Sequence, residues 1–361
     1  MKLTDICDFQ GGSQPPKEEW SFDKQDGYVR MLQIRDFTQS ERVTPEYIKI
    51  SNSTKVCEAD DILIARYGAS IGKILTGLAG AYNVAIMRTI PDTSKIKKKY
   101  LYYYLKSSYF QNAIINVGSR AAQAGFNKED LSKLDIECPK LVEQEGVINI
   151  LEKIEAVIEK QKEELTSLDD LIKARFVEMF GDENNSRNWN VVNVEEVADV
   201  QVGVVIKPSQ YYTDESNGVK AFRSLNIGAG FIKDIDWAYF TKEGHLKNSK
   251  SILKENDLLI VRSGAPGTAC VVTEEFAGCN AVDVIIAHLD CEKVNPYYLC
   301  TFTNMPHGKK QINEGTGGAA QQHFNVGKYN KLRLMLPPKM LQDEFAVFIQ
   351  QVNKSKFIRH Y

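Results

Sequence analysis

The sequence predicts a mixed α/β (α+β) protein in which two similar globular domains alternate with two helical segments. The first observation is an internal repeat: the residues AAQAGFN at 121–127 return 198 positions later as AAQQHFN at 319–325. The second is the pattern inside each copy, where short alternating strands are separated by turn residues. The third is a long helix with a narrow apolar seam between the copies. Two similar units in one chain imply two similar surfaces related by a pseudo-two-fold axis.

The repeat indicates a duplicated domain and not a solenoid. Its spacing rises from 191 at Gln10 and Gln201 to 198 near the end of each copy, so the second copy contains a few short insertions. Solenoid repeats have much shorter periods, of about 20–50 residues. We therefore expect four parts, which are a first globular domain at 1–138, a central coiled-coil helix at 139–181, a second globular domain at 182–337 and a short C-terminal helix at 338–361.

Composition is that of an ordinary water-soluble protein. The 361 residues are 43% hydrophobic and 25% charged, enough for two or three domains with real cores. No apolar run approaches a membrane span, and the N-terminus lacks the apolar stretch of a secretory signal, so we expect a cytoplasmic protein. Seven scattered cysteines without a C-x-x-C pair favour structural thiols over disulfides or zinc. The net charge of −2 means that any DNA affinity must come from local basic surface.

Strand and turn signals organise the first domain. Residues 28–32 alternate as a short strand, and 62–65 form a buried-strand run that Gly68 ends. The segment GASIGK at 68–73 resembles a phosphate-binding loop, but it is one residue short and continues into Ile74 where a Mg²⁺-binding Ser or Thr is required. We expect a tight turn there. Residues 100–110 predict one helix whose aromatic side chains mainly pack into the core.

The central helix has a coiled-coil seam. Apolar residues recur at alternating steps of three and four, outward positions are rich in Lys and Glu, and Gly181 ends the helix. The seam positions are Val147, Leu151, Ile154, Ile158, Leu165, Leu168 and Ile172. From residue 147 to 180 such a helix spans roughly 50 Å, which suits a spacer. The alternative is a long core helix packed on its own domain.

The second domain and the last helix repeat this plan. The strand DLLIVRSGA at 257–265 matches DILIARYGA at 61–69, and RSLNI at 223–227 aligns with RMLQI at 30–34. In the last helix Phe345, Ile349 and Val352 take the places of Val147, Leu151 and Ile154. This helix is shorter than its twin, so part of the central seam near one end should remain uncovered.

No motif predicts catalysis. We find no nucleophile elbow, zinc-binding helix, dinucleotide fingerprint or Asn-Pro-Pro-aromatic tetrapeptide, so we expect neither enzyme activity nor a bound cofactor or metal. What recurs is polar and basic. Arg, Asn and Gln can contact base edges in pairs of hydrogen bonds, and Lys can contact phosphates. The candidates for DNA binding are Arg30, Arg35, Arg66, Lys73, Arg120, Gln123, Asn127, Arg223, Asn226, Arg262, Lys309, Lys310, Gln321, Gln322 and Asn325.

Structural roles compete with DNA contacts for several of these residues. A repeated Asn or Gln that caps loop backbone is as good an interpretation as a base reader. Residues kept in both copies should serve the scaffold or contact phosphates, whereas sequence readers should lie where the copies differ.

Four segments together carry a family resemblance. They are the opening DFQGGSQPP at 8–16, the DILIARYG strand at 61–68, the loop at 121–127 and the helix entry at 139–144. In this order, and duplicated, they resemble the DNA specificity subunit of type I restriction–modification systems. The resemblance implies two target-recognition domains that read a bipartite, asymmetric target in double-stranded DNA. It also implies two methyltransferase subunits as partners, with restriction and translocase subunits in the full complex. AdoMet, Mg²⁺ and ATP would belong to those partners.

Two other functions remain open at this point. The chain could be a coiled-coil scaffold that joins two protein- or ligand-binding domains, or it could be a nuclease or methyltransferase that acts alone.

Overall fold

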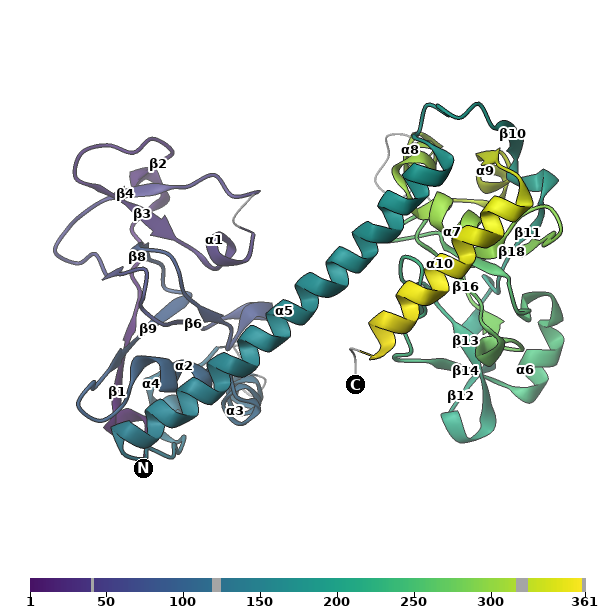
Figure 1. The fold of residues 1–361 in the computed structure, drawn as a ribbon. Helices are drawn as coiled ribbons and strands as arrows, with labels where there is room; N and C mark the ends of the chain where they lie inside the picture. The colour runs from purple at the N-terminus through teal and green to yellow at the C-terminus, as the bar shows by residue number, and fades with distance from the viewer. Residues whose placement is uncertain (40–41, 119–124, 316–323, 359–361) are drawn as a thin grey trace. The chain divides into compact units, whose positions relative to one another are not determined.

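The computed structural model describes residues 1–39, 42–118, 125–315 and 324–358 and divides into two compact units. The first unit is Met1–Ile158 and the second is Glu159–Tyr361. The boundary falls inside one 40-residue helix, α5 (Leu141–Phe180), which therefore contributes residues to both units. Each unit contains both helices and sheets, so the predicted mixed α/β class is confirmed (Figure 1).

Two sheets form the frame of the first unit. One is a four-stranded sheet in the order β1-β9-β6-β7, and the other is a five-stranded sheet in the order β2-β4-β3-β8-β5. The strands are β1 (Cys7–Gly11), β2 (Trp20–Ser21), β3 (Tyr28–Leu32), β4 (Tyr47–Lys49), β5 (Val56–Cys57), β6 (Leu63–Ala65), β7 (Ile74–Leu75), β8 (Gly80–Tyr82) and β9 (Ile86–Pro91).

Helices complete this unit. They are α1 (Ile34–Thr38), α2 (Lys98–Lys106), α3 (Ser108–Gly118), α4 (Lys128–Ser132) and the N-terminal part of α5. The single helix expected at 100–110 is wrong, because Ser107 adopts an extended backbone and separates α2 from α3. The expected turn at 68–73 is confirmed: Gly68 and Gly72 both have positive φ angles, which glycine adopts without strain.

The second unit repeats the arrangement. Its four-stranded sheets have the orders β11-β18-β15-β16 and β12-β14-β13-β17, and β10 pairs with β19. The strands are β10 (Asn190–Asn193), β11 (Ala198–Val202), β12 (Tyr212–Thr213), β13 (Gly218–Phe222), β14 (Ala238–Thr241), β15 (Leu258–Val261), β16 (Ala269–Val271), β17 (Asn280–Ala281), β18 (Val284–Leu289) and β19 (Arg333–Leu336). The helices are α6 (Lys242–Lys247), α7 (Pro296–Asn304), α8 (Pro306–Gly315), α9 (Val326–Asn330) and α10 (Lys339–Ile358).

In each unit the segment that begins the globular part pairs with the segment that ends it, before the next long helix. In the first unit the backbone N–H of Ile136 donates to the Met1 carbonyl at 2.9 Å, and that of Leu3 donates to the Leu134 carbonyl at 2.9 Å. In the second unit β10 pairs antiparallel with β19, with Asn190 opposite Leu336. The chain that surrounds the core of each unit is therefore joined to itself by backbone hydrogen bonds at its two ends.

The strand register corrects one alignment made from sequence. In β3 Leu32 pairs in parallel with Tyr82, and in β13 Phe222 pairs in parallel with Ala281, so Leu32 and Phe222 are structural twins. Arg30 then corresponds to Lys220, not to Arg223. The sequence alignment was wrong by three positions because RMLQI and RSLNI resemble each other although one lies mainly in the strand and the other follows it.

The last helix covers only one part of the central helix. In the second unit, Arg175 of α5 forms an ion pair with Glu344 of α10 at 3.4 Å, and Lys356 forms one with Asp169. Because the earlier α5 residue meets the later α10 residue, the two helices run antiparallel (Figure 1). Of the seam positions predicted in α10, Phe345 is fully buried, and Ile349 and Val352 are 6% and 7% exposed.

The N-terminal part of the α5 seam is open, as the short last helix predicts. Val147, Ile154 and Ile158 are 40%, 48% and 45% exposed. Leu151, Leu165, Leu168 and Ile172 are half-buried. The seam analysis missed Ile148, which is 5% exposed, because it lies one residue beside the expected position.

A buried glutamine anchors the start of each long helix. Gln144 of α5 accepts a hydrogen bond from the Lys97 backbone N–H at 2.8 Å and donates to the carbonyls of Lys95 and Pro139, each at 2.8 Å. Its twin Gln342 of α10 accepts from the Asn295 N–H at 2.8 Å and donates to Pro337 O at 2.8 Å. Both side chains are fully buried. Each long helix is thus fixed to the segment that precedes α2 or α7.

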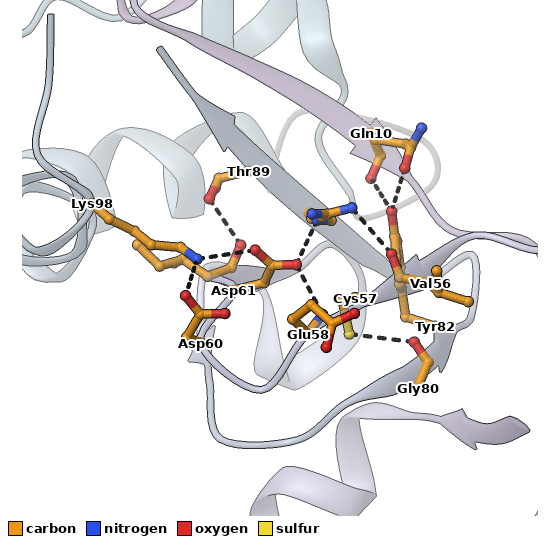
Figure 2. Close-up of polar contacts among 12 residues, drawn as sticks. Gln10, Val56, Cys57, Glu58, Asp60, Asp61, Gly80, Tyr82, Thr89 and Lys98 are labelled. Carbon is orange, nitrogen blue, oxygen red and sulfur yellow. Dashed lines mark hydrogen bonds and ion pairs between the residues drawn. The ribbon is translucent and has the colours of Figure 1, made fainter. Parts of the chain in front are cut away.

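An acidic turn before β6 ties three elements of the first unit together. Asp61 accepts hydrogen bonds from the Glu58 backbone N–H at 3.0 Å and from Lys98 of α2 at 3.1 Å, and it lies 2.7 Å from the guanidinium of Arg88 on β9 (Figure 2). Burial alone would raise the pKa of Asp61, but these hydrogen bonds and the Arg88 charge lower it below its usual value. The twin Asp257 has a different partner, His288, at 2.6 Å.

All seven cysteines are free, and five of them are buried, namely Cys7, Cys57, Cys270, Cys279 and Cys300. Burial raises the pKa of Cys7 to about 12 and that of Cys57 to about 11, which makes both thiols poor nucleophiles. Their role as structural thiols agrees with the sequence analysis.

The Asp61 cluster predicts an acid-sensitive first unit. Asp61→Asn should lower the free energy of unfolding by about 2 kcal/mol near neutral pH, because Arg88 and Lys98 lose a buried counter-charge and are only partly exposed themselves. A lowered folded-state pKa contributes stability above the unfolded pKa of roughly 4, and that stability is lost as pH falls through the folded value. Urea unfolding at pH 7 and at pH 2.5 should therefore show a large difference between variant and parent only at pH 7. Asp60→Asn is the matched control, because Asp60 is 80% exposed and pairs with Lys98 alone; an equal loss in both variants would contradict the assignment.

Candidate nucleic-acid interface

The same arginine holds the same loop at the end of a central strand in both units. Arg66 follows β6, and its Nε donates to the Phe126 carbonyl at 3.2 Å. Arg262 follows β15, and its Nε donates to the Phe324 carbonyl at 3.3 Å. Each guanidinium thus fastens the C-terminal end of the repeated loop to the sheet. This shared contact identifies Arg66 and Arg262 as scaffold residues at an edge formed by a strand end, a glycine turn and a loop.

Tyr67 gives the edge of the first unit a feature that the second unit lacks. It forms an isolated antiparallel bridge with Gly125, and the Arg66 guanidinium lies 5.0 Å from the centre of its ring. A Cβ atom at Gly125 would lie 2.3 Å from that ring, so the loop can approach only as glycine. Tyr67 is 38% exposed, and Ser263 stands at its place in the second unit. The sequence analysis did not select Tyr67; the signal was an aromatic residue directly after a repeated arginine, at a position where the copies differ.

The two edges carry different charge. Arg262 forms an ion pair with Asp283 at 2.5 Å and is 16% exposed, so its charge is neutralised within the protein. Within the described part of the first unit, neither Arg66 nor the exposed Lys73 has a carboxylate at ion-pair distance. Among the described residues, the charges of Arg66 and Lys73 beside the turn after β6 are therefore unpaired, whereas the charge of Arg262 is paired with Asp283.

Lys309 and Lys310 differ in their availability for phosphate. Lys309 donates to the Pro266 carbonyl at 3.2 Å and to Thr268 Oγ1 at 3.3 Å, and burial lowers the pKa of its ammonium group. It thereby supports the turn after β15. Lys310 is exposed, with a single long ion pair to Glu183 at 3.9 Å. Of the two, Lys310 is the better placed to contact a phosphate.

Three candidate arginines in or near β3 and β13 are paired with carboxylates. Arg30 contacts Asp36 at 2.7 Å, Arg35 pairs with the buried Glu46, and Arg223 lies 3.3 Å from Asp236. Their charges are largely compensated, so they order the loops around them. Asn226 is fully buried and donates to the Ile235 carbonyl at 2.7 Å. It occupies the place of Asp36 and not a surface position.

Asn127 and Asn325 cap helices. Asn127 Oδ1 accepts from the Asp130 N–H at 3.0 Å at the start of α4, and Asn325 Oδ1 accepts from the Lys328 N–H at 3.0 Å at the start of α9. Of the two interpretations that the sequence left open, the cap accounts for this repeated residue. Arg120, Gln123, Gln321 and Gln322 lie outside the described residues. In the sequence they lie between Gly118 and Gly125 or between Gly315 and Phe324.

The family model for the type I restriction modification DNA specificity domain matches residues 1–167 and again 186–359. The chain belongs to this family. A type I restriction enzyme specificity subunit of Methanocaldococcus jannaschii, MjaVIII, is 25% identical over 236 residues, which cover 60% of this chain and 53% of that protein. The chain thus spans about half the length of the curated relative that it matches.

Two solved structures share the fold. One chain, from a study of complex assembly and conformational transition in a type I R-M system, has a TM-score of 0.55 at 15% identity and covers 100% of this chain and 92% of that chain. The S subunit of a type I restriction-modification system from M. genitalium has a TM-score of 0.50 at 14% identity, covering 100% and 90%. The likeness to these two structures supports the overall fold.

Neither a metal centre nor a membrane helix is found in the described parts of this specificity-domain protein. The described His, Cys, Asp and Glu residues contain no group of three or more that could hold a metal ion. Among the described helices, none is both long and apolar enough to cross a bilayer.

The anchoring role of Arg66 can be measured directly. Arg66→Ala should lower the free energy of unfolding by about 2 kcal/mol, since the Phe126 and Val84 carbonyls both lose a charged donor, the latter at 3.3 Å. Arg66→Lys should recover little of this, because one ammonium group cannot reproduce the guanidinium geometry. Chemical denaturation gives the free energies, and limited proteolysis between residues 118 and 125 reports whether the loop is released. Unchanged stability and unchanged cleavage in Arg66→Ala would contradict the anchor.

Proposed function

We propose that this chain is the non-catalytic DNA-recognition subunit of a type I restriction–modification complex. In this proposal each unit reads one half of a bipartite, asymmetric target in double-stranded DNA. The observation that carries it is the paired edge described above, where one arginine anchors the repeated loop identically in both units while the neighbouring residues differ. Membership of the specificity-domain family supports the same assignment.

In this proposal the residues shared by both units position the loops, and the residues that differ read the sequence. Arg66 and Arg262 make the same hydrogen bond in both units, so they position the loops and carry no sequence information. The neighbouring residues differ: Tyr67 in the first unit corresponds to Ser263 in the second. In the second unit Asp283 also neutralises the charge of Arg262, whereas in the described residues Arg66 has no carboxylate partner. Base readout from positions that differ, with phosphate contact from exposed lysines such as Lys73 and Lys310, would give two half-sites of different sequence.

Catalysis and cofactors belong to partner subunits in this proposal. Methyltransferase subunits, expected to number two, would dock on the chain, and restriction and translocase subunits would join in the full complex. The exposed part of the α5 seam supports a docking role, because the seam residues Ile154 and Ile158 are 48% and 45% exposed and the neighbouring Val157 is 56% exposed. Contiguous exposed apolar surface of this kind commonly marks a protein interface.

Independent reading by the two units is the central expectation. Exchanging residues 13–120 for the corresponding segment of another family member should change one half of the methylated sequence when the chain is assembled with its methyltransferase, and leave the other half unchanged. Sequencing of methylated genomic DNA measures this. A change in both halves would contradict independent reading. No change in either half would favour a scaffold that joins two protein-binding domains.

Docking of the methyltransferase should depend on the exposed seam. Ile158→Asp should lower co-purification of the methyltransferase by at least about tenfold, since it places a charge in an apolar contact. Lys160→Asp, an exposed change two residues away and off the seam, is the matched control. Thermal unfolding of both variants checks that the units remain folded. Equal recovery of the methyltransferase with both variants would exclude the seam as its docking surface.

A further inference from the structure

A short helix in the second unit replaces a plain turn of the first. Residues 50–56 lie between β4 and Cys57 in the first unit, whereas residues 242–252 lie between β14 and Leu253 in the second. The additional length forms α6, which packs against β13 and β14 (Figure 1). An insertion on a shared scaffold is a place where the two units can differ in what they bind.

The inserted segment is basic. Residues 242–252 contain three lysines and one glutamate, in a chain whose net charge is −2. All three lysines are exposed, and in the part of the chain that the structure describes none of them has a carboxylate at ion-pair distance. They are Lys242, Lys247 and Lys250. The matching residues 50–56 include a single lysine, the half-buried Lys55. At this place of the fold, positive charge is therefore concentrated in the second unit.

A buried asparagine holds α6 and the turn after it. Asn280 of β17 is fully buried, and its amide nitrogen donates to Ser251 Oγ at 2.9 Å, while that hydroxyl donates to the Asn248 carbonyl at 2.9 Å. The Asn280 Oδ1 atom therefore faces His245 of α6 and accepts from its Nδ1 at 2.7 Å. In the first unit Ala81 takes the place of Asn280, so this anchor accompanies the insertion.

A second polar chain holds Lys250 by its backbone. The Gln201 amide nitrogen of β11 donates to the Lys250 carbonyl at 2.6 Å and lies 2.7 Å from His288 Nε2. Because that amide can only donate, the imidazole proton is on Nδ1, 2.6 Å from the buried Asp257. Ile90 takes the place of His288 in the first unit. The backbone that carries the lysines is thus fixed, which lowers the entropy lost when their side chains bind a partner.

This surface fits phosphate better than it fits a protein. Lysine presents a point charge without a fixed geometry, which suits contact with the DNA backbone and not the reading of a base edge. Protein interfaces are depleted in lysine and enriched in aromatic residues. Within residues 242–252, which are all described, Leu246 is the one large apolar side chain that is exposed, at 71%. The segment therefore lacks the apolar centre of a protein interface.

We propose that residues 242–250 form a platform that holds DNA phosphates in the second unit, independently of base sequence. The described residues 50–56 of the first unit form no such platform, so the two units hold the duplex unequally. This inference rests on the proposed function, because DNA is the partner that supplies the phosphates. It adds a segment that contributes affinity and salt dependence and reads no bases.

Removing the three charges should weaken binding to all sequences alike. The platform variant carries Lys242→Gln, Lys247→Gln and Lys250→Gln in the chain assembled with its methyltransferase. Anisotropy titrations use one fluorescent duplex with the methylated sequence and one scrambled duplex. The plot of log Kd against log salt concentration should become shallower by about two to three, since each lost phosphate contact removes about 0.9. Both duplexes should bind at least about tenfold more weakly at about 150 mM salt, and the methylated sequence should not change.

The matched control removes three lysines that are already paired within the protein. Lys173→Gln, Lys293→Gln and Lys339→Gln change the net charge equally, but each ammonium group is paired with an aspartate three or four residues away. This control should leave the salt dependence as it is in the parent. Glu243→Gln is the opposite change, because it removes the one carboxylate of the segment, and it should tighten binding to both duplexes about twofold.

Equal salt dependence of the platform and control variants, with binding by the parent intact, would overturn the inference and leave the proposed function standing. A parent complex that binds no DNA would remove both. A changed methylated sequence would make the lysines base readers, and loss of the methyltransferase from the platform variant would make the surface a protein interface; either result would overturn the platform. Thermal unfolding checks that the second unit stays folded. If the triple change unfolds it, Lys250→Gln alone is used, with an expected change in slope of about 0.9.

Discussion

The buried glutamine at the head of each long helix is the interaction on which the architecture depends. Gln144 and Gln342 are fully buried, and each joins the segment before a helix of its unit to the proline turn that starts the long helix. An unpaired buried amide would destabilise the unit, so this position strongly favours glutamine in the observed conformation. Gln144 therefore fixes the start of α5 to the segment before α2, and Gln342 fixes the start of α10 to the segment before α7.

Sequence reasoning recovered the elements whose physical signal is local. Periodicity predicted the two copies and the buried strands after Asp61 and Asp257. Glycine positions predicted the turn at 68–73 and the end of the long helix at Gly181. The open part of the seam also followed, because it required only a comparison of helix lengths. Side-chain partners could not be predicted in this way. The alignment of Arg30 with Arg223 failed because similar letters lie on opposite sides of a strand end, and only the pairing of β3 with β8 reveals the register.

The candidate site shows the same limit. Most of the selected arginines are compensated by a carboxylate that lies distant in sequence or in a neighbouring turn, such as Asp283 for Arg262 or Glu46 for Arg35. Composition cannot reveal such pairs, because they depend on tertiary contacts. Phe176 and Phe180 of α5, which are fully buried in the core of the second unit, were missed for a related reason: they face the globular unit and not the coil seam, and a heptad pattern reports only one face of a helix. Arg120, Gln123, Gln321 and Gln322 stay predictions.

In each unit the pairing between the two ends of the globular part bears on how a duplicated chain avoids misassembly. Tandem domains of similar sequence are prone to exchange strands while they fold. Here the Met1–Leu3 segment pairs with residues 134–136, which are synthesised before α5 and before the whole of the second unit. The two ends of the first globular part can therefore pair before the second globular part is synthesised. The order of translation thus separates the two copies in time, and the long helix made between them extends that delay.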